Sequence, residues 1–311
     1  MRDVELRDAE DGAAQDVVIV GAGFAGLYLL HRLRGLGLKV RVFEAAAGVG
    51  GTWYWNRYPG ARCDVESMQY SYSFLPELQQ EWQWSELFAA QPEILRYANH
   101  VADRLDLRRD IGFETRVTEA TFDESSLRWT VRTDRGDRVS TRHLVMATGC
   151  LSAARRPDFK GADRFRGPTY HTGHWPHAGA DFTGLRVAVI GTGSSAIQAI
   201  PVIAAEAKHL TVFQRTPNFS IPSRNGPMPE AYAQSWKDAY GERRREARET
   251  CNGILAYPND VSALAVDAAQ RALFLTGAAY AAIIFAGSQK GLHYLAPLPW
   301  IFLAPALEAS S

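Results

Sequence analysis

The sequence predicts an α/β protein with two parallel βαβ units, a small antiparallel meander and a helical segment. First, VVIVGAGFAGLYLL at 17–30 is echoed by VAVIGTGSSAIQAI at 187–200, so the chain carries an internal repeat. Second, each copy runs from a β-branched stretch through glycines into apolar residues at helical spacing. Third, a second strand pattern follows each copy, RVFE at 41–44 and TVFQ at 211–214. We therefore expect two folding units of the same kind.

The first unit is predicted to run in the order strand, turn, helix, strand. Residues 17–20 are all β-branched and indicate a buried parallel strand. The turn covers Gly21 to Gly26, the helix covers 24–36, and the second strand covers 41–44. Residues 186–213 supply the second unit at nearly the same length.

The stretch between the two units predicts a helix and then a meander. The helix begins at Gln91-Pro92, because proline favours the first turn of a helix. Its apolar face comprises Ile94, Leu95, Ala98, Val101, Ala102 and Leu105. Apolar and polar residues alternate over 127–132, residues 135–137 supply a turn, and 138–148 return as a strand. We expect a small antiparallel meander inserted into the first domain.

The composition is that of a soluble globular protein without a strong net charge. Hydrophobic residues make up 46% and charged residues 22% of the chain, which is ordinary for a soluble globular protein. Lys plus Arg and Asp plus Glu are 34 each, so no net charge draws the protein to nucleic acid or to a membrane surface. A small-molecule partner and a monomer are expected. Residues 1–15 lack the apolar run of a signal peptide and read as a solvated lead-in, which favours the cytoplasm.

The three cysteines, Cys63, Cys150 and Cys251, are too far apart for a CxxC pair or for zinc-ligand spacing. This spacing favours a reducing compartment and predicts no metal site. Further along, GERRREARE at 241–249 predicts a solvated helix face rather than a nucleic-acid patch. Two apolar stretches follow at 272–287 and 292–307. The first has 16 residues, short of the ~20 needed to span a bilayer, so we expect no membrane anchor.

The first glycine turn has the pattern of a dinucleotide-binding loop in a Rossmann-like unit. Gly21, Gly23 and Gly26 allow a tight turn, close approach of a pyrophosphate and close packing of helix on strand. Glu44 lies 18 residues beyond Gly26, at the end of the second strand, where a carboxylate can accept both hydroxyls of a ribose. A glycine turn without a ligand is the alternative.

The second turn predicts a different nucleotide. Gly191, Gly193 and Ala196 repeat the pattern, and alanine is tolerated at the third position. Gln214 stands in register with Glu44 and is followed by Arg215. An uncharged amide beside a guanidinium favours a ribose that carries a 2′-phosphate, and so NADP. Arg215 as an ordinary surface arginine is the alternative.

Two dinucleotide sites, one of them for NADP, suggest that a hydride passes from the nicotinamide to a second redox cofactor in the first site. FAD is the natural candidate. Flavoprotein disulfide reductases share this layout but need a redox cysteine pair, which the sequence lacks. Reduced flavin is therefore expected to pass its electrons elsewhere, and dioxygen is the expected acceptor.

Residues 165–176, FRGPTYHTGHWP, fit the pattern Phe-x-Gly-x-x-x-His-x-x-x-Trp-Pro just before the second unit. This resembles the fingerprint of type I Baeyer–Villiger monooxygenases, within the flavin-containing monooxygenase superfamily. The wider superfamily ends the pattern with Phe or Tyr, so Trp175-Pro176 favours the Baeyer–Villiger branch. GGTWYWNRYPGARCDVES at 50–67 resembles the same branch, and the resemblance covers about residues 15–265. It implies two Rossmann-like domains, for FAD and NADP, and NADPH-driven insertion of one oxygen atom of O2 beside a ketone carbonyl.

The resemblance also implies roles for single residues. For FAD these are Gly21, Gly23, Phe24, Ala25, Gly26, Glu44, Gly51, Thr52, Trp53, Asp64, Tyr70 and Val117. For NADP they are Arg62, Cys63, Asp64, Gly191, Thr192, Gly193, Ser194, Ser195, Ala196, Ile197, Arg215 and Thr216. Asp64 is implied beside the reactive flavin ring, and His171 and Trp175 are implied to couple domain movement to catalysis. The alternatives are core aromatics at 53–55, a turn cap at Asp64 and a structural histidine at 171.

The resemblance implies four segments. They are a lead-in at 1–15, the N-terminal part of an FAD-binding domain at 16–150, a linker with the first half of an NADP-binding domain at 151–222, and a partial helical insertion with an atypical apolar tail at 223–311. The family's peroxide-stabilising arginine comes later in its pattern and is absent here, and the spacing of Arg57, Arg62 and Arg224 supports no substitute. We therefore expect a truncated or frameshifted product. The open alternatives are a nucleotide-binding remnant, an NADPH oxidase and an N- or S-oxygenating flavin monooxygenase.

Overall fold

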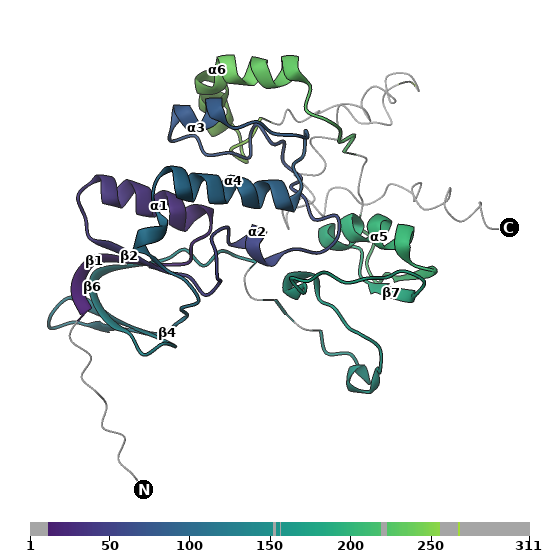
Figure 1. The fold of residues 1–311 in the computed structure, drawn as a ribbon, viewed down its shortest axis with the longest axis horizontal. Coiled ribbons are helices and arrows are strands. Elements are labelled where there is room, and N and C mark those ends of the chain that lie inside the picture. The colour runs from purple at the N-terminus through teal and green to yellow at the C-terminus, as the bar shows by residue number, and fades with distance from the viewer. Residues whose placement is uncertain (1–11, 152–153, 156, 219–222, 256–266, 268–311) are drawn as a thin grey trace, which may run out of the picture. The chain divides into compact units, whose positions relative to one another are not determined.

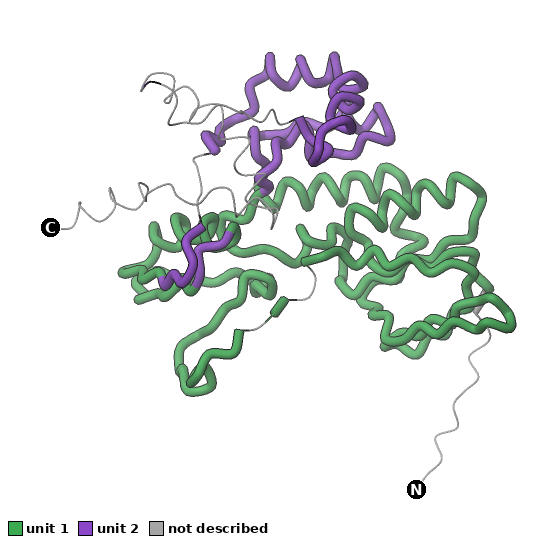
Figure 2. Tube along the Cα trace, turned by 180° about the vertical axis from the view of Figure 1, so that it is seen from behind, with its two compact units in different colours: residues 1–62, 90–190, 194–212 green, residues 63–89, 191–193, 213–311 purple. Residues whose placement is uncertain are grey.

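The computed structural model describes residues 12–151, 154–155, 157–218, 223–255 and 267. The chain forms two compact units (Figure 2). The first comprises 1–62, 90–190 and 194–212, and the second comprises 63–89, 191–193 and 213–311. The two apolar stretches predicted near the end of the sequence lie outside the described residues.

The first unit contains a six-stranded sheet with the strand order β3-β2-β1-β6-β5-β4. Its parallel half comprises β1 (Gly12–Val20), β2 (Val40–Phe43), β3 (Ile111–Gly112) and β6 (Arg138–Met146). β1 pairs with β2 from Val17↔Val40 to Val20↔Phe43. Strand β1 is buried over 17–19 because it has a partner strand on both sides, as the β-branched run predicts. The predicted α/β fold is confirmed.

Two helices, α1 (Phe24–Gly35) and α4 (Gln91–Arg104), lie over one face of the parallel strands (Figure 1). Proline in the first turn of α4 and its buried face confirm the sequence prediction for this helix. Tyr97, which the sequence pattern did not single out, is fully buried and lies with its ring centroid 6.2 Å from that of Phe24. A short helix, α2 (Thr52–Trp55), and a 3-10 turn at Arg108–Asp110 complete this side of the unit.

The meander consists of β4 (Val117–Asp123), β5 (Arg128–Thr133) and β6. It is present as predicted, but it is not a separate sheet, because β6 pairs antiparallel with β5 and parallel with β1. β6 can do so because a strand has two edges and pairs with one neighbour along each. Val131 of the meander packs against Val18 and Phe43, so the first unit has a core on each side of its parallel strands.

The second strand–turn–helix copy comprises β7 (Arg186–Ile190), α5 (Ser194–Glu206) and β8 (His209–Phe213), with β7 and β8 forming a two-stranded sheet. Alternate residues of both strands are half-buried, and Val187, Val189 and Leu210 pack against a cluster that includes α5. The buried members of this cluster are Trp175, Phe182, Ala199 and Ile203. Short 3-10 turns at Ala162–Arg164 and Thr172–His174 lie in the preceding segment.

The second unit is built from α3 (Pro76–Glu81), its flanking loops and the long helix α6 (Glu230–Glu249). The prediction that 241–249 is a purely solvated helix face is wrong at two arginines. Arg244 donates to the carbonyl oxygens of Gln69 at 2.6 Å and Ser71 at 3.0 Å, and Arg243 stacks 4.6 Å above the ring of Trp236. The physical reason is that a long side chain can reach a distant main chain, as Arg244 does across 175 positions, or cover an aromatic ring of its own helix, as Arg243 does.

Candidate dinucleotide sites

The first glycine turn joins β1 to α1 in a conformation that requires glycine. Gly21 has φ +105°, and its N–H donates to the carbonyl oxygen of Phe43 at 2.8 Å. A Cβ on Gly26 would lie 1.9 Å from the carbonyl oxygen of Gly21. Only glycine therefore lets α1 begin this close to β1. No described side chain caps α1, whose N-cap is Gly23, so the turn presents backbone N–H groups as a phosphate site does.

Glu44 is buried at the end of β2 and is bonded to this turn. Its Oε2 accepts the N–H of Ala22 at 2.6 Å, and its Oε1 accepts the N–H of Ala46 at 2.8 Å. Its exposed fraction is 5%. A carboxylate has about four lone-pair positions, so both oxygens can hold the backbone and still accept ribose hydroxyls. Glu44, the residue predicted to bind the ribose, therefore also holds the glycine turn in shape.

The loop that precedes α2 returns to the same turn. Gly50 N–H donates to the carbonyl oxygen of Ala22 at 3.1 Å. A Cβ on Gly51 would lie 2.8 Å from the Cα of Gly23, so Gly51 has no room for a side chain against that backbone. The structure thus brings Gly51, Thr52 and the buried Trp53 beside the first turn. Phe24 and Ala25 follow in the first turn of α1, and Val117 begins β4 within the core of the meander.

The predicted residues Cys63, Asp64 and Tyr70 belong to the second unit. Burial raises the pKa of the Cys63 thiol to about 12, which favours the protonated thiol at neutral pH. Asp64 is exposed as a residue, but partial burial of its carboxyl group raises its pKa above the ordinary value. Tyr70 is half-buried, and its N–H donates to the carbonyl oxygen of Glu66 at 2.9 Å.

The second glycine turn repeats the geometry of the first. Gly191 has φ +102°, and its N–H donates to the carbonyl oxygen of Phe213 at 2.8 Å, as Gly21 does to Phe43. Gln214 takes the place of Glu44, and its Nε2 donates to Thr192 Oγ1 at 2.8 Å. In both copies the residue after the second strand therefore bonds the residue between the first two glycines. The predicted register is confirmed.

The partners differ in chemistry between the two turns. In the first turn a carboxylate accepts a backbone N–H, whereas in the second an amide donates to a hydroxyl. Arg215 and Thr216 follow Gln214 and are exposed. Ser194, Ser195, Ala196 and Ile197 form the first turn of α5, where Ser194 and Ile197 are exposed and the other two are half-buried. The second turn thus carries an amide where the first carries a buried acid, and the exposed Arg215 follows that amide.

The two fingerprint residues have local partners. His171 is half-buried, and its Nδ1 accepts the N–H of Gly173 at 3.1 Å, which closes the 3-10 turn that begins at Thr172. Trp175 is buried in the cluster with Ala199 and Ile203 of α5. The bond of His171 agrees with the alternative of a structural histidine. A role of His171 and Trp175 in coupling domain movement to catalysis stays a prediction.

One residue at this site was missed by the sequence analysis. Gln198 of α5 accepts from the Tyr58 hydroxyl at 2.8 Å and donates to the Arg62 carbonyl oxygen at 3.1 Å. A signal was present, because Gln198 is the only polar residue in the stretch AIQAIPVIAA at 196–205. Among the described residues, no group of His, Cys, Asp or Glu could hold a metal ion, and no helix is long and apolar enough to cross a membrane.

Two strand–turn–helix units with matched glycine turns are the arrangement of a protein with two dinucleotide-binding folds. The chain belongs to the pyridine nucleotide-disulphide oxidoreductase family, whose model matches residues 18–227.

Individual relatives narrow the similarity further. The chain is 46% identical to a Baeyer–Villiger monooxygenase of Pseudooceanicola batsensis over 81% of its own length and 46% of that relative. It is 47% identical to a phenazine N-monooxygenase of Lysobacter antibioticus over 72% of its own length and 42% of that relative. The solved structure of an oxidized steroid monooxygenase bound to NADP matches with a TM-score of 0.80 and 59% identity. That match covers 87% of this chain and 53% of the other.

These comparisons confirm the resemblance to Baeyer–Villiger monooxygenases that the fingerprint indicated. The chain spans about half the length of the curated relatives it matches. The roles of the single site residues stay predictions, and so do the boundaries of the four predicted segments.

Proposed function

We propose that the protein acts in an FAD- and NADPH-dependent Baeyer–Villiger oxidation of a small ketone. One oxygen atom of O2 is inserted beside the carbonyl carbon, and the product is an ester or a lactone. Ketone, O2, NADPH and a proton give product, NADP+ and water, so the electrons balance. The observation that carries the proposal is a difference between two equivalent positions. Glu44 accepts a hydrogen bond from its glycine turn, whereas Gln214 donates one to its own turn.

The first turn fits FAD. The backbones of Gly23 and Gly51 lie close together without side chains between them. Such an exposed backbone suits a pyrophosphate lying against it. Glu44 offers a carboxylate to the ribose diol from a position that its bonds to Ala22 and Ala46 hold still. Trp53 and Thr52 would line the flavin, and Asp64 and Tyr70 would supply further contacts. When bound, FAD supplies the redox chemistry that activates O2.

The second turn fits NADP. Gln214 brings no negative charge to the ribose, and the exposed Arg215 can pair with a 2′-phosphate. The first turn of α5 follows directly and would receive the pyrophosphate at its positive end. The chain's own residues therefore bind, orient and distinguish the two nucleotides. Arg62, Cys63 and Asp64 would lie where the nicotinamide meets the flavin.

The test is a set of three measurements on the purified 311-residue chain. Flavin absorbance bands in the purified protein, tighter binding of NADPH than of NADH, and ester formation from a test ketone would support the proposal. NADPH consumption that yields only hydrogen peroxide would favour an NADPH oxidase. Nucleotide retention without turnover would favour a binding remnant. A protein that takes up no flavin and prefers NADH would overturn both cofactor assignments.

A second candidate is oxygenation of a ring nitrogen. It is favoured by the 47% identity to the phenazine N-monooxygenase, which is as high as the identity to the Baeyer–Villiger relative. Both reactions use the same two nucleotide sites, so the sites do not separate them. Incubation with a ketone and with an aromatic N-heterocycle in parallel, with product analysis by mass spectrometry, does separate them. A cytoplasmic location and a monomer remain predictions, to be measured by cell fractionation and light scattering.

A further inference from the structure

Gln198 uses its whole amide group to hold one short loop. Its Oε1 accepts from the Tyr58 hydroxyl at 2.8 Å and from the Arg62 N–H at 3.2 Å. Its Nε2 donates to the Arg62 carbonyl oxygen at 3.1 Å. The amide thus pairs with the main chain of Arg62 as a neighbouring strand would, although the two residues are 136 positions apart.

The loop at 58–62 also packs against the backbone of α5. Gly60 has φ +77°, and a Cβ there would lie 2.3 Å from the carbonyl oxygen of Gln198. No other residue could bring the loop this close. The Tyr58 ring packs against the buried cluster that contains Trp175 of the fingerprint. The loop therefore contacts α5 through hydrogen bonds, backbone packing and an aromatic side chain.

The other side of the same loop is bonded to the residues around the first turn. Arg62 forms an antiparallel bridge with Ala90, and the N–H of Gln91 donates to the Ala61 carbonyl oxygen at 2.8 Å. The Gln91 side chain in turn donates to the carbonyl oxygen of Trp53. A continuous set of hydrogen bonds therefore runs from Trp53, beside the first turn, to Gln198 on α5.

We propose that Gln198 is a positioning residue that links occupancy of the second nucleotide site to the loop that carries Arg62. This rests on the proposed function, in which the first turn of α5 receives the NADP pyrophosphate. Gln198 is the fifth residue of α5, one turn beyond Ser194. A rigid helix transmits the position of its first turn to Gln198, and Gln198 fixes the main chain of Arg62. Arg62 thus needs no further ordering when NADP binds.

The expected effect follows from this preorganisation. Without the amide, the loop must be ordered when NADP binds, and part of the binding free energy is spent on that ordering. We expect Gln198→Ala to raise the Kd for NADP+ about tenfold. The Kd for FAD should change less than about twofold, because the Glu44 contacts are untouched. Tyr58→Phe removes one of the three hydrogen bonds and keeps the ring in its cluster, so it should give a smaller rise, about threefold.

The experiment measures amide hydrogen exchange over residues 57–62 in the full chain, with and without NADP+, alongside titrations of both nucleotides. In the wild type, exchange at the Arg62 amide should be slow both with and without NADP+. In Gln198→Ala it should be about tenfold faster without ligand. Glu206→Ala is the matched control, because it places the same residue on an exposed position of the same helix. It should behave as the wild type.

The outcomes separate this inference from the proposed function. If the wild type binds no NADP+, the proposed function fails, while exchange at Arg62 still reports whether Gln198 holds the loop. Wild-type exchange and wild-type NADP+ affinity in Gln198→Ala would overturn the inference. An equal loss of FAD and NADP+ affinity in Gln198→Ala would also overturn it, because that pattern indicates a general structural role. Should Gln198→Ala not fold, the graded effect of Tyr58→Phe decides the same question.

Discussion

Glu44 and Gln214 differ only in whether the side chain ends in a carboxylate or an amide, and the turns that they face differ to match. Ala22 offers only a backbone N–H, which a carboxylate accepts. Thr192 offers a hydroxyl oxygen, which can accept from an amide. Each turn is therefore held by the side chain that also sets the charge presented to a ribose. The residue that holds each turn is therefore also the one that we propose to select its nucleotide.

The first prediction concerns Gln214, the residue in the second turn that is equivalent to Glu44. Gln214→Glu adds a carboxylate that repels a 2′-phosphate and can accept a ribose diol. We expect the preference for NADPH over NADH to fall about tenfold, which corresponds to ~1.4 kcal/mol. The ratio of the two dissociation constants, from fluorescence titration, measures this. Gln234→Glu makes the same chemical change on an exposed position of α6 and should leave the ratio unaltered. An unchanged ratio in Gln214→Glu would show that Gln214 does not face the ribose.

The second prediction separates the folding role of a glycine from its binding role. Gly26→Ala places a Cβ 1.9 Å from a backbone oxygen, so the turn must shift, at a cost of about 1–3 kcal/mol in unfolding free energy. Gly23→Ala meets its nearest atom at 3.4 Å, so it should leave stability nearly unchanged. It should still weaken FAD binding, because the added methyl occupies the pyrophosphate approach. Denaturant unfolding and flavin content measure the two effects. Loss of stability in Gly23→Ala, or none in Gly26→Ala, would contradict the assignment.

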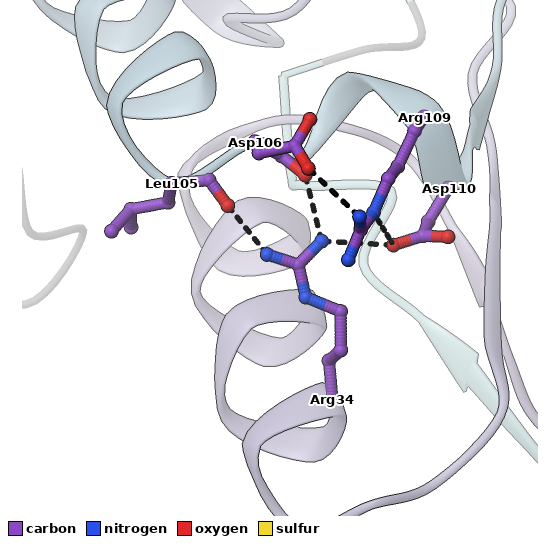
Figure 3. A network of polar contacts seen from close by, with 5 residues as sticks. All are labelled: Arg34, Leu105, Asp106, Arg109 and Asp110. Carbon is purple, nitrogen blue, oxygen red and sulfur yellow. Dashed lines mark hydrogen bonds and ion pairs between the residues drawn. The ribbon is translucent and has the colours of Figure 1, made fainter.

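At the scale of elements, α1 and α4 are joined at their C-terminal ends by one arginine (Figure 3). Arg34 Nη1 donates to the Asp106 carbonyl oxygen at 2.7 Å and to Asp110 Oδ2 at 2.9 Å, and its Nη2 donates to the Leu105 carbonyl oxygen. The last carbonyls of a helix have no partner within the helix, so the guanidinium supplies the bonds that α4 lacks. Arg109 pairs with Asp106 Oδ2 at 2.9 Å and extends the network.

The third prediction tests this junction. Arg34→Ala removes a charged donor from two part-buried acceptors, Asp110 Oδ2 and the Leu105 carbonyl oxygen, and from the exposed Asp106 carbonyl oxygen. We expect a loss of about 1–2 kcal/mol in unfolding free energy, reduced from the value for a buried site because solvent screens the pair. Chemical denaturation provides the measurement. Arg32→Ala, at an exposed position of the same helix, is the control and should cost less than about 0.5 kcal/mol. Equal costs for both substitutions would exclude a specific role for Arg34.

The second unit contains a buried acid that the proposed reaction does not use. Glu66 has an exposed fraction of 5%, and its Oε2 accepts from the Tyr232 hydroxyl of α6 at 2.6 Å. Burial raises the pKa of Glu66, against the opposing hydrogen bonds from Tyr232 and Gln69 and the charge of Arg243. Folded Glu66 therefore holds its proton more tightly than the unfolded chain does.

The fourth prediction is that the raised pKa of Glu66 makes the stability of the protein depend on pH. Stability from Glu66 is fully present below its pKa in the unfolded chain and is lost as the pH rises through the higher pKa of the folded state. Glu66→Gln should remove this loss, so stability falls less from about pH 4 to about pH 7. Thermal unfolding across that range measures the slope. Glu77→Gln, at an exposed position of α3, should leave the slope as in the wild type. A slope that Glu66→Gln does not change would rule out Glu66 as its source.

For the whole molecule, the sequence predicted what local signals encode. The β-branched run at 17–20, its glycine turn and the repeat at 187–200 fixed the fold class and both candidate turns, because each signal lies within about thirty residues. Contacts between distant residues leave no periodic pattern in the sequence. Gln198 meets Arg62 across 136 positions and Arg244 meets Gln69 across 175. The sequence pattern gave Gln198 no role and placed Arg244 on a solvated helix face. The dual pairing of β6 was missed for the same reason.

The fifth prediction treats the whole chain as a receptor for two ligands. A ligand that binds only the folded state raises its stability with concentration, by about 2.7 kcal/mol at a hundred times Kd. FAD and NADP+ should each raise the Tm, and NAD+ should raise it less than NADP+ at equal concentration. Arg215→Ala should abolish the difference between NADP+ and NAD+, because the exposed guanidinium is the proposed partner of the 2′-phosphate. The FAD shift should persist, since Glu44 and its turn are unaltered. Arg248→Ala, at an exposed position of α6, is the control for charge alone. If NADP+ and NAD+ protect the wild type equally, Arg215 is an ordinary surface arginine.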